Sequence, residues 1–302
     1  MNRLPIVWDA AYSPEFPESH RFPMAKFRLL KEWVDHNVPQ TQCFSPTPCS
    51  LDVVLQTHDS QYVSDFQSGT LDPKVAREIG LPWSTGLRDR TILALGGSIK
   101  TCELARTYGL ASHLAGGTHH AHFDHGSGFC IYNDLAVSAR YLVNQGLASR
   151  VLIFDCDVHQ GDGTASILAN DSQTFTCSIH AEKNFPVRKV ESDLDVSCPD
   201  GMTDDDYVVL VFETLESLIA GWHPDFVIYD AGSDVHMDDA LGRLSITTDG
   251  LYQRDYGVIS RIRKAGIPCA TVIGGGYDKD RTRLAERHGV VVSAAARFFL
   301  RI

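Results

Sequence analysis

The stretch VLIFDCDVHQGDG, residues 151–163, decides the fold. It opens with four apolar residues, and three side chains able to bind a metal follow at alternate positions: Asp155, Asp157 and His159. In an extended chain, alternate side chains point to the same side. Short apolar runs that end in carboxylates are typical of the carboxyl ends of parallel strands, where open α/β sheets bind their ligands. We therefore predict that this stretch ends a central strand and carries a metal site.

Strand-like and helix-like segments alternate from this stretch towards both ends of the chain. The hydrophobic patterns predict strands over residues 5–8, 51–55, 110–115, 151–155, 174–179, 226–230 and 268–273. They predict helices over residues 22–36, 59–66, 85–108, 135–143, 203–222, 250–264 and 280–300, and a loop over residues 39–50. The alternation favours a mostly parallel sheet with helices on both faces. We expect one three-layer α/β/α domain over residues 1–302.

Composition narrows the class of protein. The chain has 302 residues, 43% hydrophobic and 22% charged, which is ordinary for a globular protein with a large core. Its net charge is −11 and it has no long Lys/Arg cluster, so nucleic acid is a poor partner. We find no apolar window long enough to span a membrane, and the apolar run at the N-terminus is too short for a signal peptide. The eight cysteines are scattered without a CxxC pair, which favours reduced thiols in the cytoplasm.

Four predicted strand ends carry unusual polar groups. They are GGTHHAH at residues 116–122, DCDVHQGD at residues 155–162, DAGSD at residues 230–234 and GGGY at residues 274–277. Because parallel strands end at the same edge of a sheet, we expect these four segments to meet there.

Asp157 and His159 are candidate metal ligands, and Asp234 is the best distant third. Three protein ligands and an open position suit a catalytic zinc ion, although oxygen-rich ligation also accepts Fe(II). Taken singly, the two aspartates could equally cap strand ends and His159 could be a hydrogen-bonded core histidine. The three together favour a metal.

His119 and His120 need partners that fix their tautomers, and Asp155 and Asp162 remain available in the metal stretch. Two His–Asp dyads beside one metal would provide a general base and a general acid or electrostatic stabiliser. The alternative is an incidental histidine pair in a loop.

Tyr277 follows three glycines, which allow close approach of the backbone to a ligand. Its hydroxyl could donate to a developing oxyanion, or it could simply be a packed aromatic in a tight turn. His122, His125 and His236 stay unassigned, with a solvated or supporting role expected for them.

Six segments in order together resemble the zinc-dependent histone deacetylase superfamily. They are GTHHA (117–121), GSGFCIYND (126–134), DCDVHQGDG (155–163), DAGSD (230–234), LGRLSIT (241–247) and GGGY (274–277). Gln160, where most classes have a second histidine, and the short loops look most like the class IV branch and its bacterial relatives.

The resemblance implies an arginase/deacetylase α/β fold with a zinc site. It implies Asp157, His159 and Asp234 as zinc ligands, the dyads His119–Asp155 and His120–Asp162, and Tyr277 as the group that polarises the carbonyl. His120 would be the base and then the acid. Family positions that line an acyl-lysine channel match Gly128, Phe129, Phe185 and Leu241. A monovalent-cation site, with K⁺ as the candidate ion, matches the backbone around Asp155, Asp157 and His159 together with Ser178 and Ile179.

The expected activity is zinc-dependent hydrolysis of an N-acylated amine, foremost acyl-lysine in proteins, by a deacetylase or a long-chain deacylase. The alternatives are an acetylpolyamine deacetylase, a two-metal ureohydrolase-like enzyme and an inactive binding module. Gly161 stands where a ligand for a second metal would help, which favours one metal. Many relatives hold the substrate backbone with an acidic residue on the pocket rim, and residues 82–86 offer none.

Overall fold

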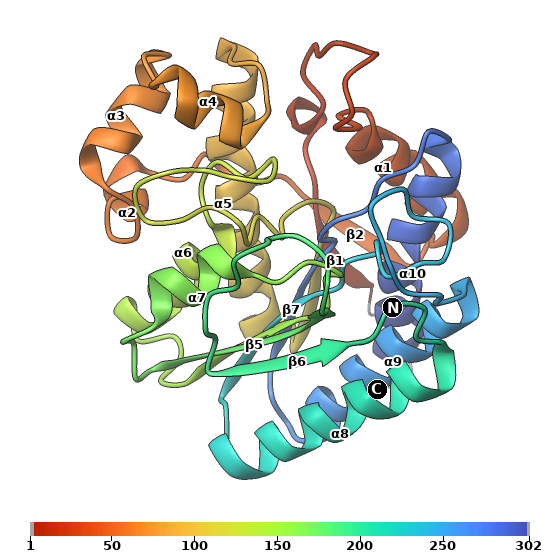
Figure 1. Cartoon of the computed structure of the whole chain (residues 1–302). Coiled ribbons are helices and arrows are strands. Elements are labelled where there is room, and N and C mark those ends of the chain that lie inside the picture. The colour runs from red at the N-terminus through yellow and green to blue at the C-terminus, as the bar shows by residue number, and fades with distance from the viewer. Residues whose placement is uncertain (1–2, 301–302) are drawn as a thin grey trace.

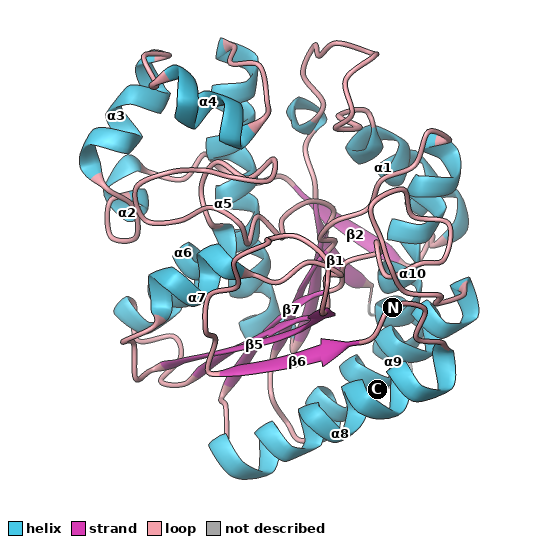
Figure 2. Cartoon of the chain, viewed as in Figure 1, coloured by secondary structure: helices cyan, strands magenta, loops and turns pink. Residues whose placement is uncertain are grey.

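Parallel strands form one sheet, and helices cover both of its faces (Figure 1; Figure 2). The computed structural model describes residues 3–300. Its eight-stranded sheet has the order β2-β1-β3-β8-β7-β4-β5-β6, and every neighbouring pair is parallel. The strands are β1 (Leu4–Val7), β2 (Thr41–Phe44), β3 (Leu110–His113), β4 (Val151–Asp155), β5 (Thr174–Ala181), β6 (Leu194–Cys198), β7 (Phe226–Asp230) and β8 (Cys269–Val272). The expected three-layer α/β/α fold is confirmed.

The two helical layers are unequal. One face carries α1 (Lys26–Asn37), α8 (Asp204–Trp222), α9 (Thr248–Lys264) and α10 (Arg281–Phe299); the other carries α5 (Thr85–Tyr108), α6 (Asp134–Asn144) and α7 (Asp162–Leu168). The short helices α2 (Leu51–Val54), α3 (Ser60–Ser68) and α4 (Pro73–Ile79) lie beyond the sheet, at the upper left of Figure 1, and η1 (Ala10–Tyr12) is a single 3₁₀ turn. No helix within residues 3–300 is both long and apolar enough to cross a membrane.

The alternation of side chains along the strands explains the two layers. In β4, Val151 and Ile153 belong to the core beneath α5 and α6, whereas Leu152 and Phe154 belong to the core beneath α8 and α9. All four side chains are buried, because a central parallel strand is covered on both faces.

Several element predictions were wrong, mostly in short or peripheral segments. Residues 51–55 form the helical turn α2 rather than a strand, because the Ser50 carbonyl accepts hydrogen bonds from Val53 and Val54. The predicted loop at residues 39–50 contains β2, and α1 begins at Lys26, four residues later than predicted. Elements β6, α4 and α7 were not predicted.

The sheet order brings the polar strand ends together. Strands β3, β8, β7 and β4 are consecutive neighbours, and each of the four polar segments includes or follows the carboxyl end of one of them. The predicted convergence at one edge of the sheet is therefore observed.

Candidate active site

The three predicted metal ligands converge in a buried cluster. Nδ1 of His159 lies 3.0 Å from Oδ1 of Asp157 and 3.2 Å from Oδ2 of Asp234. Four-coordinate zinc, with bonds of about 2.0–2.1 Å to nitrogen and oxygen, separates its ligand atoms by roughly 3.3 Å. Asp157 and Asp234 are almost fully buried, and the three ligand groups form one of the two clusters of potential metal ligands found in residues 3–300.

The remaining contacts of these side chains leave room for a metal. Oδ1 of Asp234 accepts from the Val158 amide at 2.8 Å, whereas its buried Oδ2 makes no hydrogen bond within residues 3–300. Oδ2 of Asp157 accepts from the Gly275 amide at 2.6 Å. A Cβ atom at residue 275 would lie 2.6 Å from that same Oδ2, so glycine is needed there. Two buried carboxylates beside an imidazole nitrogen, with one oxygen unsatisfied, suit a divalent cation.

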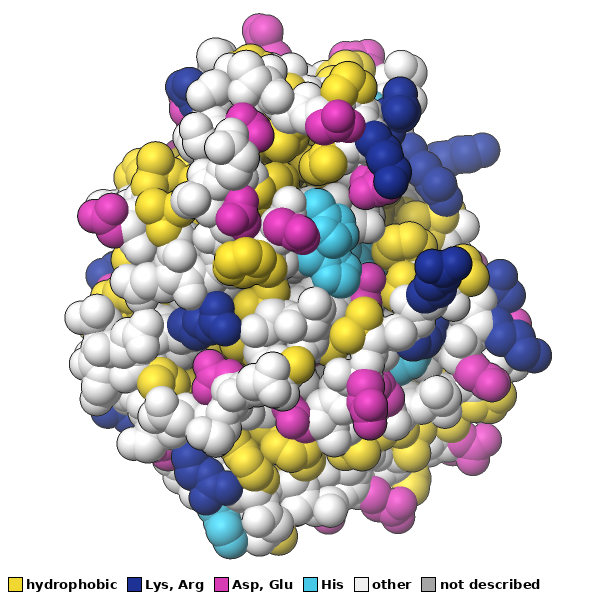
Figure 3. All heavy atoms as spheres, turned by 60° about the vertical axis from the view of Figure 1, so that its left-hand side comes forward, with side chains coloured by type: hydrophobic (Ala, Val, Ile, Leu, Met, Phe, Trp, Pro, Cys, Tyr) yellow, Lys and Arg dark blue, Asp and Glu magenta, His cyan; other side chains and the backbone are white. Residues whose placement is uncertain are grey.

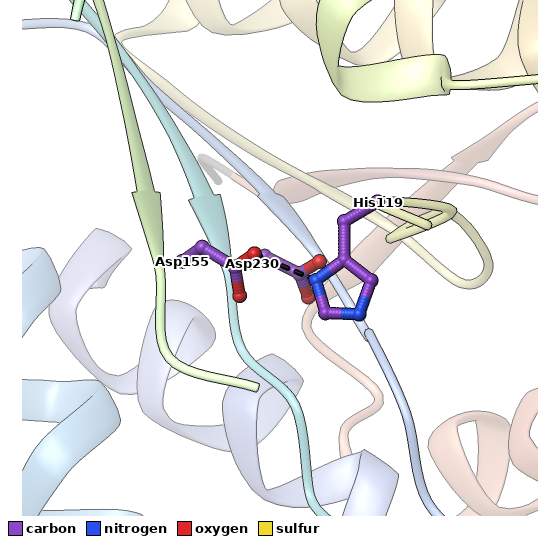
Figure 4. Close-up of side chains that lie close together, drawn as sticks. All are labelled: His119, Asp155 and Asp230. Atoms are coloured by element: carbon purple, nitrogen blue, oxygen red, sulfur yellow. Dashed lines mark hydrogen bonds and ion pairs between the residues drawn. The ribbon is translucent and has the colours of Figure 1, made fainter. Parts of the chain in front are cut away.

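Both predicted His–Asp pairs are present. Nδ1 of His119 lies 2.7 Å from Oδ2 of Asp155, and Nδ1 of His120 lies 2.6 Å from Oδ1 of Asp162. Figure 4 shows the His119 ring reaching from the loop after β3 to Asp155 at the end of β4. Residue 161 lies against the first pair, because a Cβ there would be 2.5 Å from Oδ2 of Asp155. A larger ligand residue at that position would displace the dyad.

The two histidines differ in protonation. Burial lowers the pKa of His119, but the charges of Asp155 and Asp157 outweigh burial and hold this pKa well above its ordinary value. Burial, and then the charge on His119, lower the pKa of His120 to about 4. At neutral pH His120 is therefore the ring able to accept a proton, and His119 is a fixed positive charge.

Asp230, at the end of β7, is a further buried carboxyl beside the first dyad (Figure 4). Both of its oxygens are buried and make no hydrogen bond within residues 3–300. Burial and then the charge of Asp155 raise its pKa well above the ordinary value, which favours the protonated form of Asp230. The sequence places Asp230 in the polar segment DAGSD at a strand end but assigns it no role in the site.

Tyr277 is held by a residue that the sequence did not single out. The Asp239 carboxylate accepts from the Tyr277 amide at 2.6 Å and from the Leu241 amide at 2.8 Å. It thereby links the tyrosine loop to the predicted channel. Burial raises the pKa of the Tyr277 hydroxyl well above its ordinary value, so the hydroxyl remains a donor.

All four predicted channel residues line one open pocket of about 450 Å³, together with His120, His159 and Tyr277. They are Gly128, Phe129, Phe185 and Leu241. The Phe185 ring stands edge-on to His120, with ring centroids 4.8 Å apart. Gly128 has a φ of +55°, and a Cβ there would lie 2.6 Å from the His120 ring, so glycine is required at this position.

Behind these residues lies a smaller inner cavity of about 60 Å³. It shares His120, His159 and Tyr277 with the outer pocket, and it is lined by two buried cations, Lys26 and Arg90. Burial lowers the pKa of Lys26 to about 8 and that of Arg90 to about 10. Sequence reasoning missed both cations, because their helices lie far along the chain from the catalytic segments.

The predicted monovalent-cation residues are also neighbours. Asp155 in β4 and Ser178 in β5 are paired in register, and Ile179 follows in β5. The Ser178 hydroxyl lies 3.0 Å from Nδ1 of His180 and accepts weakly from the Gly161 amide at 3.4 Å. The residues are therefore neighbours, and the K⁺ ion that they would bind stays a prediction.

Residues at the start of α6 hold the loop that carries His119 and His120 in place. The Asp134 carboxylate accepts from the amide and hydroxyl of Thr118 at 2.7 and 2.6 Å, and the Asn133 amide group donates to the Ala121 carbonyl at 3.0 Å. We had quoted both residues only as part of a motif. Their side-chain bonds across more than ten residues could not be read from local pattern.

Comparisons with known proteins identify relatives of this chain and a structure with the same fold. The chain is 47% identical to an uncharacterised protein of Picosynechococcus sp., over 97% of this chain and 98% of that one. It is 27% identical to histone deacetylase 2 of Arabidopsis thaliana, over 94% of this chain and 77% of the relative. The crystal structure of the HDA15 HD domain matches with a TM-score of 0.80 at 20% identity, over 100% of this chain and 89% of that one, which shows the fold.

The fold and these relatives define a metal-dependent amide hydrolase. The model of the histone deacetylase domain matches residues 20–293. The chain therefore belongs to the histone deacetylase family.

Proposed function

We propose that this protein is a zinc-dependent deacetylase that acts on acetyl-lysine in a peptide chain. The observation that carries the proposal is the cluster of Asp157, His159 and Asp234, because its His159 lines the outer pocket together with His120 and Tyr277. A metal ion held by these three residues would act as a Lewis acid on the amide carbonyl and on water.

Side chains of the protein move the protons and stabilise the developing charge. His120 presents a neutral Nε2, because its Nδ1–H is directed to Asp162, and it takes a proton from the attacking water. The same nitrogen returns a proton to the leaving amine. The Tyr277 hydroxyl donates to the oxygen of the carbonyl as negative charge develops there. His119 and Asp155 hold a fixed charge pair beside His120, and Asp162 keeps the His120 ring in one tautomer.

The inner cavity favours a short acyl group. One water molecule needs roughly 10–15 Å³ of such space, so a cavity of about 60 Å³ holds about four to six waters. A cavity of this size suits an acetyl group better than a long fatty chain. The cations Lys26 and Arg90 also suit acetate, the anionic product.

The pocket mouth favours a peptide over a polyamine. Arg21 and Arg77, both exposed, line the outer pocket and would repel a substrate with several positive charges. Glu78 lies at the same mouth and is a candidate holder of the substrate backbone. Residues 82–86 offer no such acid, and Glu78 lies in α4, a helix that the sequence did not predict.

We propose the class IV branch because Gln160 donates to the Val190 carbonyl at 2.7 Å and to Asp195 at 2.8 Å, a supporting role for a residue that differs from most classes. We propose a cytoplasmic enzyme because all eight cysteines are free. We further propose that residues 1–302 act as one catalytic domain, with K⁺ at the Asp155–Ser178 site.

The test is a substrate panel on protein reconstituted with Zn²⁺ or, without oxygen, with Fe²⁺. The panel comprises peptides carrying acetyl-, butyryl- and myristoyl-lysine, and N-acetylputrescine. We expect the zinc enzyme to have its highest kcat/KM on the acetyl peptide, and a chelator to abolish turnover. A preference for the myristoyl peptide or for N-acetylputrescine would refute the proposed substrate, and turnover by chelated protein would refute the metal mechanism. Two bound metals per chain would favour the ureohydrolase-like alternative.

A further inference from the structure

The Asp162 carboxylate has two histidine partners rather than one. Its Oδ1 lies 2.6 Å from Nδ1 of His120, and its Oδ2 lies 3.2 Å from Nε2 of His122. Asp162 is only 5% exposed. Burial raises the pKa of Asp162, but the hydrogen bonds from His120 and His122 outweigh burial and keep this pKa below its ordinary value. The carboxylate is therefore an anion that accepts on both oxygens.

The second histidine is itself held in place from two sides. Its ring stacks on the His125 ring, with centroids 4.5 Å apart and an interplanar angle of 6°. Its backbone amide donates to the His125 carbonyl at 2.8 Å, and its own carbonyl lies 2.9 Å from Nδ1 of His58. A histidine fixed in this way has little freedom to leave Asp162.

The stacked pair connects the buried dyad with the surface. The His122 side chain is 15% exposed and the His125 side chain is 37% exposed, with His125 paired to Asp124 at 2.7 Å. Histidine side chains reach the surface beside acidic ones on the face shown in Figure 3.

We propose that His122 is a positioning residue for the reaction: it donates to the second oxygen of Asp162 and so fixes the carboxylate that orients His120. A carboxylate bonded through one oxygen can rotate about its terminal bond, whereas bonds to both oxygens fix its plane. A fixed plane keeps Nδ1–H of His120 directed at Asp162. Its Nε2, which lies 3.1 Å from Nε2 of His119, then carries no proton of its own and can accept one in the reaction. This inference rests on the proposed function for its kinetic consequences only.

The kinetic test uses the full chain loaded with Zn²⁺ and an acetyl-lysine peptide. His122→Phe keeps an aromatic ring to stack on His125 but removes the hydrogen bond. We expect its kcat to fall about tenfold with KM changed less than about twofold, in line with the loss of an outer partner of a catalytic group. His122→Gln can donate to Asp162 again and should recover most of the activity. His125→Phe keeps the stack without touching Asp162 and is the matched control.

Either of two kinetic outcomes would overturn the role: a wild-type kcat in His122→Phe, or a His122→Gln variant as slow as His122→Phe. Nitrogen-15 NMR of labelled histidines in the zinc-loaded protein tests it without activity. Wild-type His120 should show one tautomer, protonated at Nδ1, and the His122→Phe variant should show a mixture. An unchanged His120 signal would refute the inference. If the wild type hydrolyses no acylated amine, the proposed function fails while the NMR result still decides the role of His122.

Discussion

The Nε2 atoms of His119 and His120 lie 3.1 Å apart, although their Nδ1 atoms lead to different carboxylates. Two imidazoles at this distance cannot both carry a full positive charge at low cost. The neighbouring carboxylates decide which ring carries the positive charge. His119 faces both Asp155 and Asp157, whereas His120 faces the single carboxylate of Asp162. The neutral ring is therefore fixed as His120, which gives the site its direction of proton transfer.

Replacing Asp162 by Asn should impair the His120–Asp162 dyad without disturbing the metal site. Asn can no longer hold Nδ1–H of His120 as an anion does, so the base loses its preferred tautomer and its electrostatic support. We expect kcat to fall by about 10²–10⁴, the range of general acid–base catalysis. Metal content by elemental analysis should stay at the wild-type value. Asp249→Asn, an exposed aspartate in α9, is the control; full activity of Asp162→Asn would show that the dyad is misassigned.

The variant Tyr277→Phe should lose one donor to the developing oxyanion. We expect kcat to fall by about 10²–10³ while metal content and KM remain near wild type. Assays of peptide deacetylation over a range of substrate concentrations measure kcat and KM separately. Tyr252→Phe removes an exposed hydroxyl from α9 and should leave kcat unchanged. An unaltered kcat for Tyr277→Phe would remove this hydroxyl from the mechanism.

Metal removal should destabilise the protein more at high pH than at low pH. Without a metal, burial and the charge of Asp157 raise the pKa of Asp234 to about 7. The folded state then binds more protons than the unfolded state between the ordinary value and about 7. Stability of the metal-free protein therefore falls as pH rises through this range, by at most about 4 kcal/mol.

Thermal unfolding of metal-free and zinc-loaded protein at pH 5, 6, 7 and 8.5 measures this effect. The gap in Tm should widen with pH, and the metal-free Asp234→Asn variant should lack this part of the pH dependence. A gap in Tm that stays constant or narrows between pH 5 and 7 would contradict the assigned cluster.

The parts of the fold that could be read from sequence are those with a strong local signal. The apolar run of β4 and the glycine after α5 marked their elements correctly, since Gly109 ends the helix with a φ of +85°. Edge strands β2 and β6 are only partly buried, so their weak alternation gave no such signal. Val53 and Val54 favoured a strand by composition, but no neighbouring strand pairs with them.

The candidate site divides in the same way. Residues that lie on the strand-end segments, such as Asp157 and Tyr277, could be named because carboxyl ends of parallel strands share an edge. Two side-chain contacts that span the fold were not assigned from pattern alone, although one of the residues lies on a strand-end segment. Asp239 reaches Tyr277 over 38 positions, and His122 reaches Asp162 over 40. Such pairings depend on tertiary geometry that no local period encodes.

The buried amine of Lys26 should lower the stability of the protein. Lys26 is only 3% exposed, and its amine lies over the rings of Phe22 and Phe27 at 5.6 and 5.4 Å. Burial lowers its pKa to about 8 from an ordinary 10.5, and the charge of Asp234 offsets burial only in part. Below pH 8 both folded and unfolded states carry the proton, so the folded state bears the full cost of the buried charge. That cost is at most about 3 kcal/mol.

Lys26→Met keeps the length of the side chain and removes the charge, so we expect a Tm several degrees above wild type at pH 7. The difference should narrow as pH rises from 8 towards 10.5, because the wild-type amine then loses its proton in the folded state and the cost disappears. Thermal unfolding of zinc-loaded protein at pH 7, 8.5 and 10 measures the trend, with Lys264→Met, on an exposed lysine in the last turn of α9, as control. A Tm of Lys26→Met at or below that of the wild type at pH 7 would contradict this expectation. It would mean that the surroundings of the amine compensate its buried charge.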